Sequence, residues 1–457
     1  MGESLTIRIN GLTERLSGVS PTLTLLEYLR TSGRVGTKEG CAEGDCGACT
    51  VAVRHGDAFR AVNSCIVPLG AVSGQEIVTA EGLADGDTLH PVQEAMARAG
   101  GSQCGYCTPG FVMSLFAATY SGERGDAVLE GNLCRCTGYR PIRDAARSLG
   151  APAEGDRFLA RSAPPEPESY SAGNAHFFHP KTLTEALELL GAHPDAKPIA
   201  GGTDVGVEIN KHGQDYPVLV SLAQIPELGC FRETGAGLEL GAALSLTDLE
   251  TRLQGRLPLL KAMLRSFAAR PIRNRATLGG NLATASPVGD LAPVLLTYDA
   301  SVTLVSSEGE RTVALHDFFT GYRTTVQRPG ELIKTVTVPE PGPGRVEAVY
   351  KVGKRGADDI STVAAAFSVG VAPDGTVTAA RLAYGGVAAT PVRAPEVEAY
   401  LLGKPWNAAT ASDAATRLRT LFTPLSDLRG SAAYRRALVG NLFEKFFYEH
   451  DHAAEAA

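Results

Sequence analysis

The chain has 457 residues, with 43 Lys and Arg against 50 Asp and Glu, which gives a formal net charge of −7. At roughly 150 residues per domain this length predicts about three domains. Apolar residues make up 44% of the chain and charged residues 20%, which excludes disorder along its whole length. The charges form no basic stripe, and no apolar run reaches the roughly 18 residues of a membrane span, so neither nucleic acid nor a membrane is an expected partner.

The N-terminus begins with a predicted strand. Residues 5–10 alternate between apolar and polar side chains, and no basic segment with an apolar core precedes them as in a signal peptide. We therefore expect a soluble, cytoplasmic protein. Disulfides are rare in that compartment, so clustered cysteines indicate metal or redox chemistry.

Eight of the nine cysteines fall into two sets of four. The first set has the spacing C-x4-C-x2-C with one more cysteine further on, and consists of Cys41, Cys46, Cys49 and Cys65. This is the spacing of plant-type [2Fe-2S] ferredoxins. Glycines in the same loop allow backbone N–H groups to turn toward the sulfurs and offset their negative charge. With a strand predicted at 50–54 and a short helix at 23–30, this region predicts a small β-grasp domain.

The second set has the spacing C-x2-C followed by C-x-C, and consists of Cys104, Cys107, Cys134 and Cys136. Thr108 and Pro109 are typical of an N-cap and a first helical residue, with the helix itself at 110–120. The helix dipole would then favour thiolates at its N-terminus. A C-x-C pair is awkward for a structural zinc site, but zinc, disulfides and free thiols remain alternatives to two iron-sulfur clusters. We expect Cys230, outside both sets, to be a small buried residue without a role.

Three segments containing these cysteines, residues 40–50, 103–110 and 131–142, resemble the iron-sulfur half of the xanthine dehydrogenase family of molybdenum hydroxylases. The resemblance implies one [2Fe-2S] cluster in a β-grasp domain and a second in a small helical domain nearer the molybdenum. It also places Gln103 and Cys136 beside the pterin of the molybdenum cofactor. A helix-capping side chain is the alternative role of Gln103.

Residues 151–170 contain four prolines and little apolar periodicity, which predicts an extended linker. After it we expect a helix at 182–190 and a strand at 197–200 that leads into Gly201-Gly202-Thr203-Asp204. Such a turn can offer N–H groups and a hydroxyl to a diphosphate, although alone it is also typical of an ordinary turn. A second segment, 275–290, is rich in small and hydroxyl-bearing residues that suit packing against a flat ligand.

Both segments resemble the FAD domain of the same family, whose fold is not a Rossmann fold. The resemblance implies that a diphosphate is wrapped by Pro198, Ile199, Ala200, Gly201, Gly202, Thr203, Asp204 and Val205. Contacts with other parts of FAD are implied for Phe267, Thr277, Gly280, Asn281, Thr284, Asp290, Ile333 and Lys351. Arg355, Asp358 and Asp359 would lie on a loop near the isoalloxazine. A solvated charged loop is the alternative for Lys351, Asp358 and Asp359.

Farther along, strands are predicted at 362–371 and 379–384, and helices at 395–402 and 431–448. The expected fold is a multidomain α+β chain. Its parts are a β-grasp ferredoxin-like domain at 1–80, a four-helix [2Fe-2S] domain at 81–150, a linker at 151–172, an α+β FAD-binding domain at 173–343, and a small α+β C-terminal flavoprotein domain at 344–457.

The resemblance covers nearly all of the chain and implies a complete small subunit without catalytic residues of its own for substrate oxidation. Electrons would come from a large subunit that carries the molybdenum cofactor and oxidises hypoxanthine or xanthine to urate. They would pass through two [2Fe-2S] clusters to FAD and then NAD, in a heterotetramer of two small and two large chains. Alternatives are a related subunit that serves aldehydes or another N-heteroaromatic, and a non-catalytic, zinc-stabilised scaffold.

Overall fold

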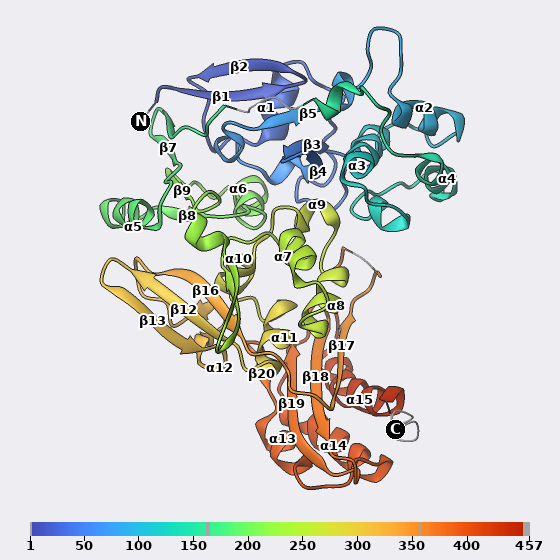
Figure 1. Cartoon of the computed structure of the whole chain (residues 1–457), viewed down its shortest axis with the longest axis vertical. Coiled ribbons are helices and arrows are strands. Elements are labelled where there is room, and N and C mark those ends of the chain that lie inside the picture. Colours follow the sequence, from blue (N-terminus) through green and yellow to red (C-terminus); the bar gives the residue numbers. More distant parts are fainter. Residues whose placement is uncertain (1, 161–164, 357, 451–457) are drawn as a thin grey trace. The chain divides into compact units, whose positions relative to one another are not determined.

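The computed structural model describes residues 2–160, 165–356 and 358–450 (Figure 1). The chain divides into two compact units. Unit 1 comprises Met1–Ile225 and Ala268–Ala276, and unit 2 comprises Pro226–Phe267 and Thr277–Ala457. No helix in the described part of the chain is long and apolar enough to cross a membrane.

Unit 1 begins with a five-stranded sheet in the order β2-β1-β5-β3-β4. Its elements are β1 (Ser4–Ile9), β2 (Leu12–Ser17), α1 (Leu25–Thr31), β3 (Thr50–His55), β4 (Ala58–Asn63) and β5 (Glu76–Val78). Alternate residues of β1, Leu5, Ile7 and Ile9, are fully buried, as the alternating sequence predicts. The Thr24 hydroxyl caps α1 by accepting the N–H of Glu27. Strand β1 pairs parallel to β5, whereas the other neighbours are antiparallel.

The next region is helical, with α2 (Pro91–Arg98), α3 (Thr108–Ser121), the 3-10 helix η4 (Asp126–Leu129) and α4 (Arg140–Ser148). The expected four helices are thus three α-helices and one 3-10 turn. Helix α3 also begins one residue earlier than expected, because Cys107 is the N-cap residue and Thr108 is already helical. The Thr108 hydroxyl instead bonds to Ser102, 2.8 Å away.

Part of the predicted linker is packed rather than extended. The 3-10 helix η5 (Arg157–Leu159) follows Asp156, whose carboxylate caps it and also accepts the Tyr120 hydroxyl at 2.8 Å. Phe158 is 9% exposed and lies edge-on to Phe116, with ring centroids 4.9 Å apart. Proline content indicated extension, but an aromatic side chain and a capping carboxylate fix this stretch onto α3. Residues 161–164, also inside the predicted linker, lie outside the described residues.

A second sheet completes unit 1, in the order β6-β7-β9-β8. Its elements are β6 (Tyr170–Ala172), β7 (Ala175–Phe178), α5 (Leu183–Ala192), β8 (Lys197–Ile199), α6 (Val205–His212) and β9 (Val218–Ser221). The short pieces that remain are η1 (Ser64–Ile66), η2 (Leu69–Val72), η3 (Ala80–Gly82) and α9 (Arg270–Arg273). Strand β6 takes up the last three residues of the predicted linker.

Unit 2 contains a five-stranded sheet in the order β10-β11-β16-β12-β13. The strands are β10 (Phe231–Thr234), β11 (Gly237–Gly241), β12 (Ser301–Ser306), β13 (Gly309–Ala314) and β16 (Leu332–Val338), beside a small hairpin of β14 (Phe319–Gly321) and β15 (Thr324–Thr325). The helices of this part are η6 (Pro226–Gly229), α7 (Leu246–Leu253), α8 (Pro258–Ser266), α10 (Leu278–Ala283), α11 (Leu291–Thr297) and α12 (Leu315–Phe318).

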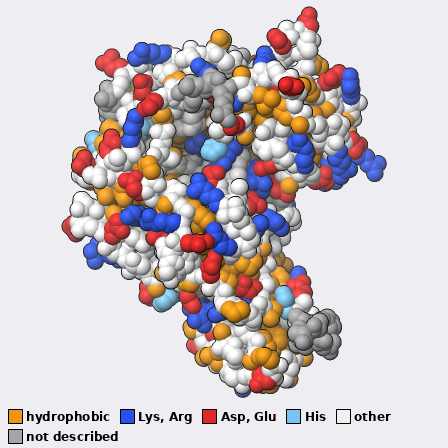
Figure 2. All heavy atoms as spheres, in the orientation of Figure 1, with side chains coloured by type: hydrophobic (Ala, Val, Ile, Leu, Met, Phe, Trp, Pro, Cys, Tyr) orange, Lys and Arg blue, Asp and Glu red, His pale blue; other side chains and the backbone are white. Residues whose placement is uncertain are grey.

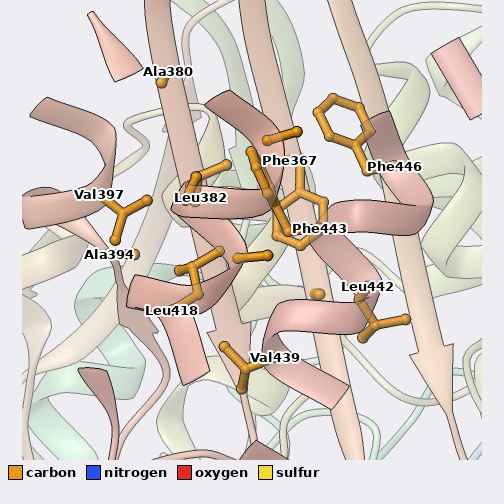
Figure 3. Packing of buried hydrophobic residues seen from close by; sticks show 14 of the residues in the cluster. Phe367, Ala380, Leu382, Ala394, Val397, Leu418, Val439, Leu442, Phe443 and Phe446 are labelled. Carbon is orange, nitrogen blue, oxygen red and sulfur yellow. The ribbon is translucent and has the colours of Figure 1, made fainter. Parts of the chain in front are cut away.

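The C-terminal part of unit 2 is an antiparallel sheet, β17-β18-β19-β20, packed on helices. Its elements are β17 (Arg345–Val352), β18 (Val363–Val371), β19 (Val377–Gly385), β20 (Val392–Arg393), α13 (Pro395–Leu401), α14 (Ala408–Leu421) and α15 (Ala432–His450). Figure 3 shows Phe443 and Phe446 of α15 beside Phe367 of β18, and their rings lie 5.7 and 5.4 Å from that of Phe367. All three are fully buried.

Charged side chains of both signs are distributed over the surface. Figure 2 shows Lys and Arg intermixed with Asp and Glu on the face in view. Many of them form exposed ion pairs, such as Arg417 with Asp413 at 3.2 Å. Exposed pairs of this kind contribute little to stability, so the fold depends mainly on the buried apolar clusters.

Removing the Phe443 ring should therefore destabilise the folded C-terminal region. We expect Phe443→Ala to lower the free energy of unfolding of this region by about 3–5 kcal/mol, because a fully buried aromatic side chain leaves a cavity. Arg436→Ala, an exposed position on the same helix, is the matched control and should cost less than about 0.5 kcal/mol. Denaturant unfolding measures both values, and equal effects would contradict this account of the core.

Candidate functional site

The loop that carries Cys41 and Cys46 directs backbone N–H groups at sulfur. Cys41 Sγ accepts N–H groups from Glu43, Asp45 and Cys46 at 3.4, 3.3 and 3.2 Å. The Cys41 N–H in turn donates to Cys46 Sγ at 3.2 Å. A Cβ on Gly40 would lie 2.6 Å from that same sulfur, so only glycine fits there. The loop is shaped around negatively charged sulfur.

The thiols of the first set contact one another. Hydrogen bonds from the thiols of Cys46 and Cys65, together with backbone N–H groups, lower the pKa of Cys41. A hydrogen bond from the Cys65 thiol likewise lowers the pKa of Cys49. Because the thiolate is the form that binds metal, these two cysteines are prepared as ligands by the chain itself.

Helix α6 braces this loop from outside the β-grasp region. Asn210 donates from Nδ2 to the carbonyls of Ala42 and Cys65, at 2.9 and 3.1 Å, and so joins the two segments that carry the cysteines. Val207 packs beside Cys49 and Cys65. A Cβ on Gly206 would lie 2.0 Å from a carbonyl oxygen of η1, which allows α6 to approach this closely.

The second set shows a similar arrangement. Cys134 Sγ lies 3.4 Å from the N–H and 3.2 Å from the hydroxyl oxygen of Thr137. Burial raises the pKa of Cys134, but hydrogen bonds from Thr137 outweigh it, and the net shift is downward. The N–H of Tyr106, with the Cys136 thiol, lowers the pKa of Cys104. Burial raises that of Cys107 to about 12. Cys104 and Cys136 are exposed, whereas Cys134 is buried.

The loops of the two sets are joined by direct hydrogen bonds. The Leu133 N–H donates to the Cys46 carbonyl at 3.0 Å, and Asn132 Nδ2 donates to the Gly47 carbonyl at 3.0 Å. A Cβ on Gly47 would lie 2.0 Å from the carbonyl oxygen of Gly131. The two loops therefore pack closely and depend on glycine at position 47. Cys46 and Cys134, one proposed ligand from each set, are connected through one hydrogen bond and a few covalent bonds.

The thiols fit [2Fe-2S] clusters. In such clusters each iron takes two protein ligands. In the first set Cys41 interacts with Cys46 and Cys65, and Cys65 also interacts with Cys49. In the second set Cys104 interacts with Cys136, and Cys107 with Cys134. Within the described ranges, no group of three or more His, Cys, Asp or Glu side chains is arranged around a single metal ion. Four thiols that contact one another, with backbone N–H donors on Cys41, suit the four cysteine ligands of a [2Fe-2S] cluster.

Gln103 is exposed, and its side chain makes no hydrogen bond to any described residue. The helix-capping alternative for Gln103 therefore finds no support in this structure. Cys230, which we expected to be buried, is only half-buried, and its thiol lies 3.7 Å from a carboxylate oxygen of Glu239. Strand β10 begins at the next residue and lies at the edge of its sheet, which leaves Cys230 partly accessible.

The turn predicted to wrap a diphosphate lies in unit 1 between β8 and α6. Gly202 has φ +78°, and its carbonyl accepts the Gly206 N–H at 2.8 Å, so the turn runs directly into the helix. A Cβ on Gly201 would lie 1.9 Å from the carbonyl oxygen of Arg275. This glycine therefore allows close approach of the chain, and its carbonyl accepts Nε of Arg275 at 2.9 Å.

The second predicted segment lies in unit 2. Thr277 caps α10 by accepting the Gly280 N–H at 3.1 Å, and the Thr284 hydroxyl donates to the Gly280 carbonyl at 3.0 Å. Asn281 Oδ1 is buried without a hydrogen-bond partner among the described residues. A buried amide oxygen is costly to leave unpaired, so this atom fits a site that receives a donor from a ligand.

Asp290, Lys351 and Ser361 form a buried polar group in the same unit. Lys351 Nζ lies 2.8 Å from Asp290 Oδ2, the Ser361 hydroxyl donates to Oδ1, and Lys351 Nζ also lies 5.9 Å from the centre of the Phe267 ring. Lys351 is in β17 with a side chain 10% exposed, so the solvated-loop alternative is wrong for this residue. Ile333, in β16, is 5% exposed.

The loop after β17 lines a pocket of about 410 Å³ within unit 2. Lys351, Lys354 and Arg355 contribute cations, and Asp359 contributes a carboxylate. Asp359 accepts the N–H groups of Lys354 and Arg355 at 2.6 and 2.9 Å. Burial raises its pKa, but these hydrogen bonds and the Arg355 charge outweigh it, and the net pKa lies below the usual value. Asp359 thus holds the backbone of this loop in place through its hydrogen bonds, and it is also partly exposed to solvent.

Sequence reasoning missed four polar side chains that the structure places at these sites. Asn132, Asn210, Arg275 and Ser361 all act through partners far away in sequence, which no local spacing indicates. Asn132 and Arg275 lie inside the segments 131–142 and 275–290 that the sequence had already indicated, so only their partners were unknown. Asn210 and Ser361 have short polar side chains on a helix and in a loop, and no sequence pattern singled them out.

Comparison with protein families gives four matches in succession. Residues 7–76 match a 2Fe-2S iron-sulfur cluster binding domain and residues 79–147 a [2Fe-2S] binding domain. Residues 171–341 match the FAD binding domain in molybdopterin dehydrogenase. Residues 348–450 match the CO dehydrogenase flavoprotein C-terminal domain. The two four-cysteine sets thus lie in the two iron-sulfur domains.

Curated relatives include several xanthine dehydrogenases. The protein of Emericella nidulans is 33% identical over 98% of this chain and 38% of its own length. Xanthine dehydrogenase/oxidase of Gallus gallus is 32% identical over 98% of this chain and 40% of its own length. The chain therefore spans about two fifths of the curated relatives it matches.

Solved structures match the chain over a shorter range. Carbon monoxide dehydrogenase from Hydrogenophaga pseudoflava is 32% identical with a TM-score of 0.57, covering 59% of this chain and 94% of that chain. Quinoline 2-oxidoreductase from Pseudomonas putida 86 is 28% identical with a TM-score of 0.57, covering 61% and 97%. Together with the four domain matches, these likenesses establish that the chain belongs to the molybdenum hydroxylase family of oxidoreductases, of which it carries the two [2Fe-2S] domains and the FAD-binding domain.

Proposed function

We propose that the chain is the electron-transfer subunit of a xanthine dehydrogenase, linking oxidation of hypoxanthine or xanthine on a molybdenum-containing partner to reduction of NAD. The observation that carries the proposal is the direct contact between the two four-cysteine loops, Leu133 N–H to the Cys46 carbonyl. The xanthine dehydrogenase names of the curated relatives support the substrate. NAD as the acceptor is part of the proposal.

When bound, [2Fe-2S] clusters carry single electrons, a flavin exchanges one or two, and a nicotinamide accepts a hydride. The chain's own residues hold and orient these groups. We propose Cys41, Cys46, Cys49 and Cys65 as ligands of one cluster and Cys104, Cys107, Cys134 and Cys136 as ligands of the other. Backbone N–H groups stabilise the thiolates, and interlocked glycines keep the two loops in contact.

The exposure of two cysteines of the second set supports the proposal that a partner chain binds there. Cys104 and Cys136 are exposed, and Tyr106 and Leu133 beside them are 51% and 43% exposed. Redox ligands and apolar side chains together at a surface are typical of an interface. We propose that a large subunit carrying the molybdenum cofactor covers this surface, in a heterotetramer of two small and two large chains.

The flavin residues are part of the same proposal. We infer that Pro198 to Val205 contact the diphosphate, and that Phe267, Thr277, Gly280, Asn281, Thr284, Asp290, Ile333 and Lys351 contact other parts of FAD. Support comes from the close approach at Gly201 in unit 1 and from the unpaired Asn281 oxygen in unit 2. Gln103 and Cys136 are proposed to face the pterin of the partner.

A second candidate is a subunit of a related hydroxylase acting on another N-heteroaromatic or an aldehyde. The likeness to quinoline 2-oxidoreductase favours it. Substrate choice would then belong to the partner, whereas the electron-transfer role of this chain would be the same. Steady-state assays of the reconstituted complex with xanthine, quinoline and an aldehyde distinguish the two candidates.

The isolated, cofactor-loaded chain should oxidise NADH with an artificial electron acceptor but should not oxidise purines. This follows because the flavin and clusters suffice for the first reaction, whereas the second needs the molybdenum cofactor. Absorbance at the NADH band and urate formation measure the two activities. Purine oxidation by the pure chain would refute the two-subunit proposal, and absence of NADH oxidation by flavin-loaded chain would refute NAD as acceptor.

Cys136→Ser should abolish xanthine-dependent NAD reduction in the complex while FAD content is largely retained. The substituted side chain removes one thiolate of the exposed pair and so prevents assembly of the second cluster. Cys230→Ser, which changes a thiol outside both sets, is the control and should leave iron content and turnover unchanged. Iron and flavin analysis accompany the assay. Four irons per chain with normal turnover in Cys136→Ser would contradict the ligand assignment.

A further inference from the structure

Arg275 has an unusual environment in unit 1. It follows α9 directly, and its side chain is half-buried against the turn between β8 and α6. Its Nε donates to the Gly201 carbonyl at 2.9 Å, which is its one hydrogen bond to the described residues. The other guanidinium donors, on the two Nη atoms, have no hydrogen-bond partner among the described residues and are not sealed away from solvent. A guanidinium has five N–H donors in a planar fork, so most of this group is unused.

Within the part of the chain that the structure describes, no carboxylate forms an ion pair with the Arg275 guanidinium. Burial lowers the pKa of Arg275 to about 10, and no acidic group acts on it. By contrast, Arg270 and Arg273 in the same short segment pair with Glu123 and Glu130, at 3.3 and 3.6 Å. Arginines in protein interiors are usually paired, because an unpaired, partly desolvated cation is costly. Arg275 thus differs from the two neighbouring arginines, whose charges are compensated by glutamates.

The backbone fixes this guanidinium to the turn. The carbonyl oxygen of Arg275 occupies the space that a Cβ at position 201 would need. The backbone of Arg275 therefore packs against Gly201, and its side chain bonds to the same residue. Nε anchors one edge of the guanidinium, which leaves the opposite edge with its paired N–H donors for a ligand. That fork matches the geometry of two oxygens on one phosphate group.

We propose that Arg275 is a binding residue for the diphosphate of FAD and supplies the positive charge that the Gly201–Gly202 turn lacks. The inference rests on FAD as the cofactor of the proposed function. Thr203 offers only a neutral hydroxyl and Asp204 carries a negative charge, so backbone N–H groups alone would have to offset the diphosphate. Arg275 contributes both charge and a bidentate hydrogen bond there.

The experiment compares FAD with riboflavin, which has the isoalloxazine ring but no phosphate. Flavin-free full-length chain is titrated with each flavin and followed by quenching of flavin fluorescence. We expect Arg275→Gln to weaken FAD binding about 10- to 100-fold, as for loss of one or two charge-assisted hydrogen bonds, and to change riboflavin binding less than about 3-fold. Arg275→Lys, which keeps the charge but not the fork, should fall between wild type and Arg275→Gln.

Two controls separate binding from structure. Arg270→Gln removes a guanidinium of the same segment that is already paired, and should leave FAD binding unchanged. The melting temperature of flavin-free Arg275→Gln should stay within a few degrees of wild type, because the lost hydrogen bond is offset by removal of an unpaired, partly buried charge. The rise in melting temperature on adding FAD should be smaller in this variant than in wild type.

Equal FAD affinity in Arg275→Gln and wild type would overturn the inference. Parallel loss of FAD and riboflavin binding would also overturn it, because it would assign Arg275 a purely structural role. A wild-type chain that binds neither flavin would refute the flavin part of the proposed function and the Arg275 inference together. That result is distinct from failure of Arg275 alone, in which wild type binds FAD normally.

Discussion

Negative charge on sulfur is the constraint on which most of unit 1 depends. A hydrogen bond to a charged group contributes about 1.5–3 kcal/mol, so a thiolate needs several N–H donors before it is stable among partly buried residues. Cys41 Sγ receives three backbone donors, and Cys134 Sγ receives donors from Thr137. Loops that bend this tightly require glycine or left-handed backbone, as at Gly44, Gly47 and Ala42.

The same constraint explains why the β-grasp and helical regions form one unit. Each cysteine loop presents carbonyl groups on the side away from sulfur, and these need donors of their own. Asn132 and Leu133 supply them to Gly47 and Cys46. The two loops therefore satisfy each other's backbone, and the resulting contact is also a short path between the two proposed clusters.

Much of this site could be predicted from sequence because the chemistry is local. Cysteine spacing, glycine content and strand alternation all lie within a few residues of one another, and they indicated the iron-sulfur domains that the family matches bear out. The FAD domain, also borne out, was expected from the resemblance of two segments to a known family. The predicted N-cap of α3 was wrong by one residue. Threonine followed by proline is common at helix N-termini, and the sequence alone does not show whether Thr108 is the cap or the first helical residue.

The residues that sequence could not reveal act over long distances in the chain. Arg275 lies 74 residues from Gly201, and Asn210 lies 168 residues from Ala42. Phe158 and Asp156 fix a stretch that composition marked as a linker, because their partners on α3 were invisible to a local pattern. A side chain whose partner is determined by tertiary packing has no periodic or spacing signal.

Helix α6 has a consequence for protein engineering. Its N-terminus follows the proposed flavin turn, while Gly206, Val207 and Asn210 on the same helix contact the first cysteine loop. A chimera that joins the iron-sulfur domains of one relative to the flavin domain of another would bring together surfaces that were never matched at this helix. A workable crossover must therefore carry residues 205–212 with the cysteine loop rather than with the flavin domain, and that places the modular boundary inside what sequence comparison treats as one domain.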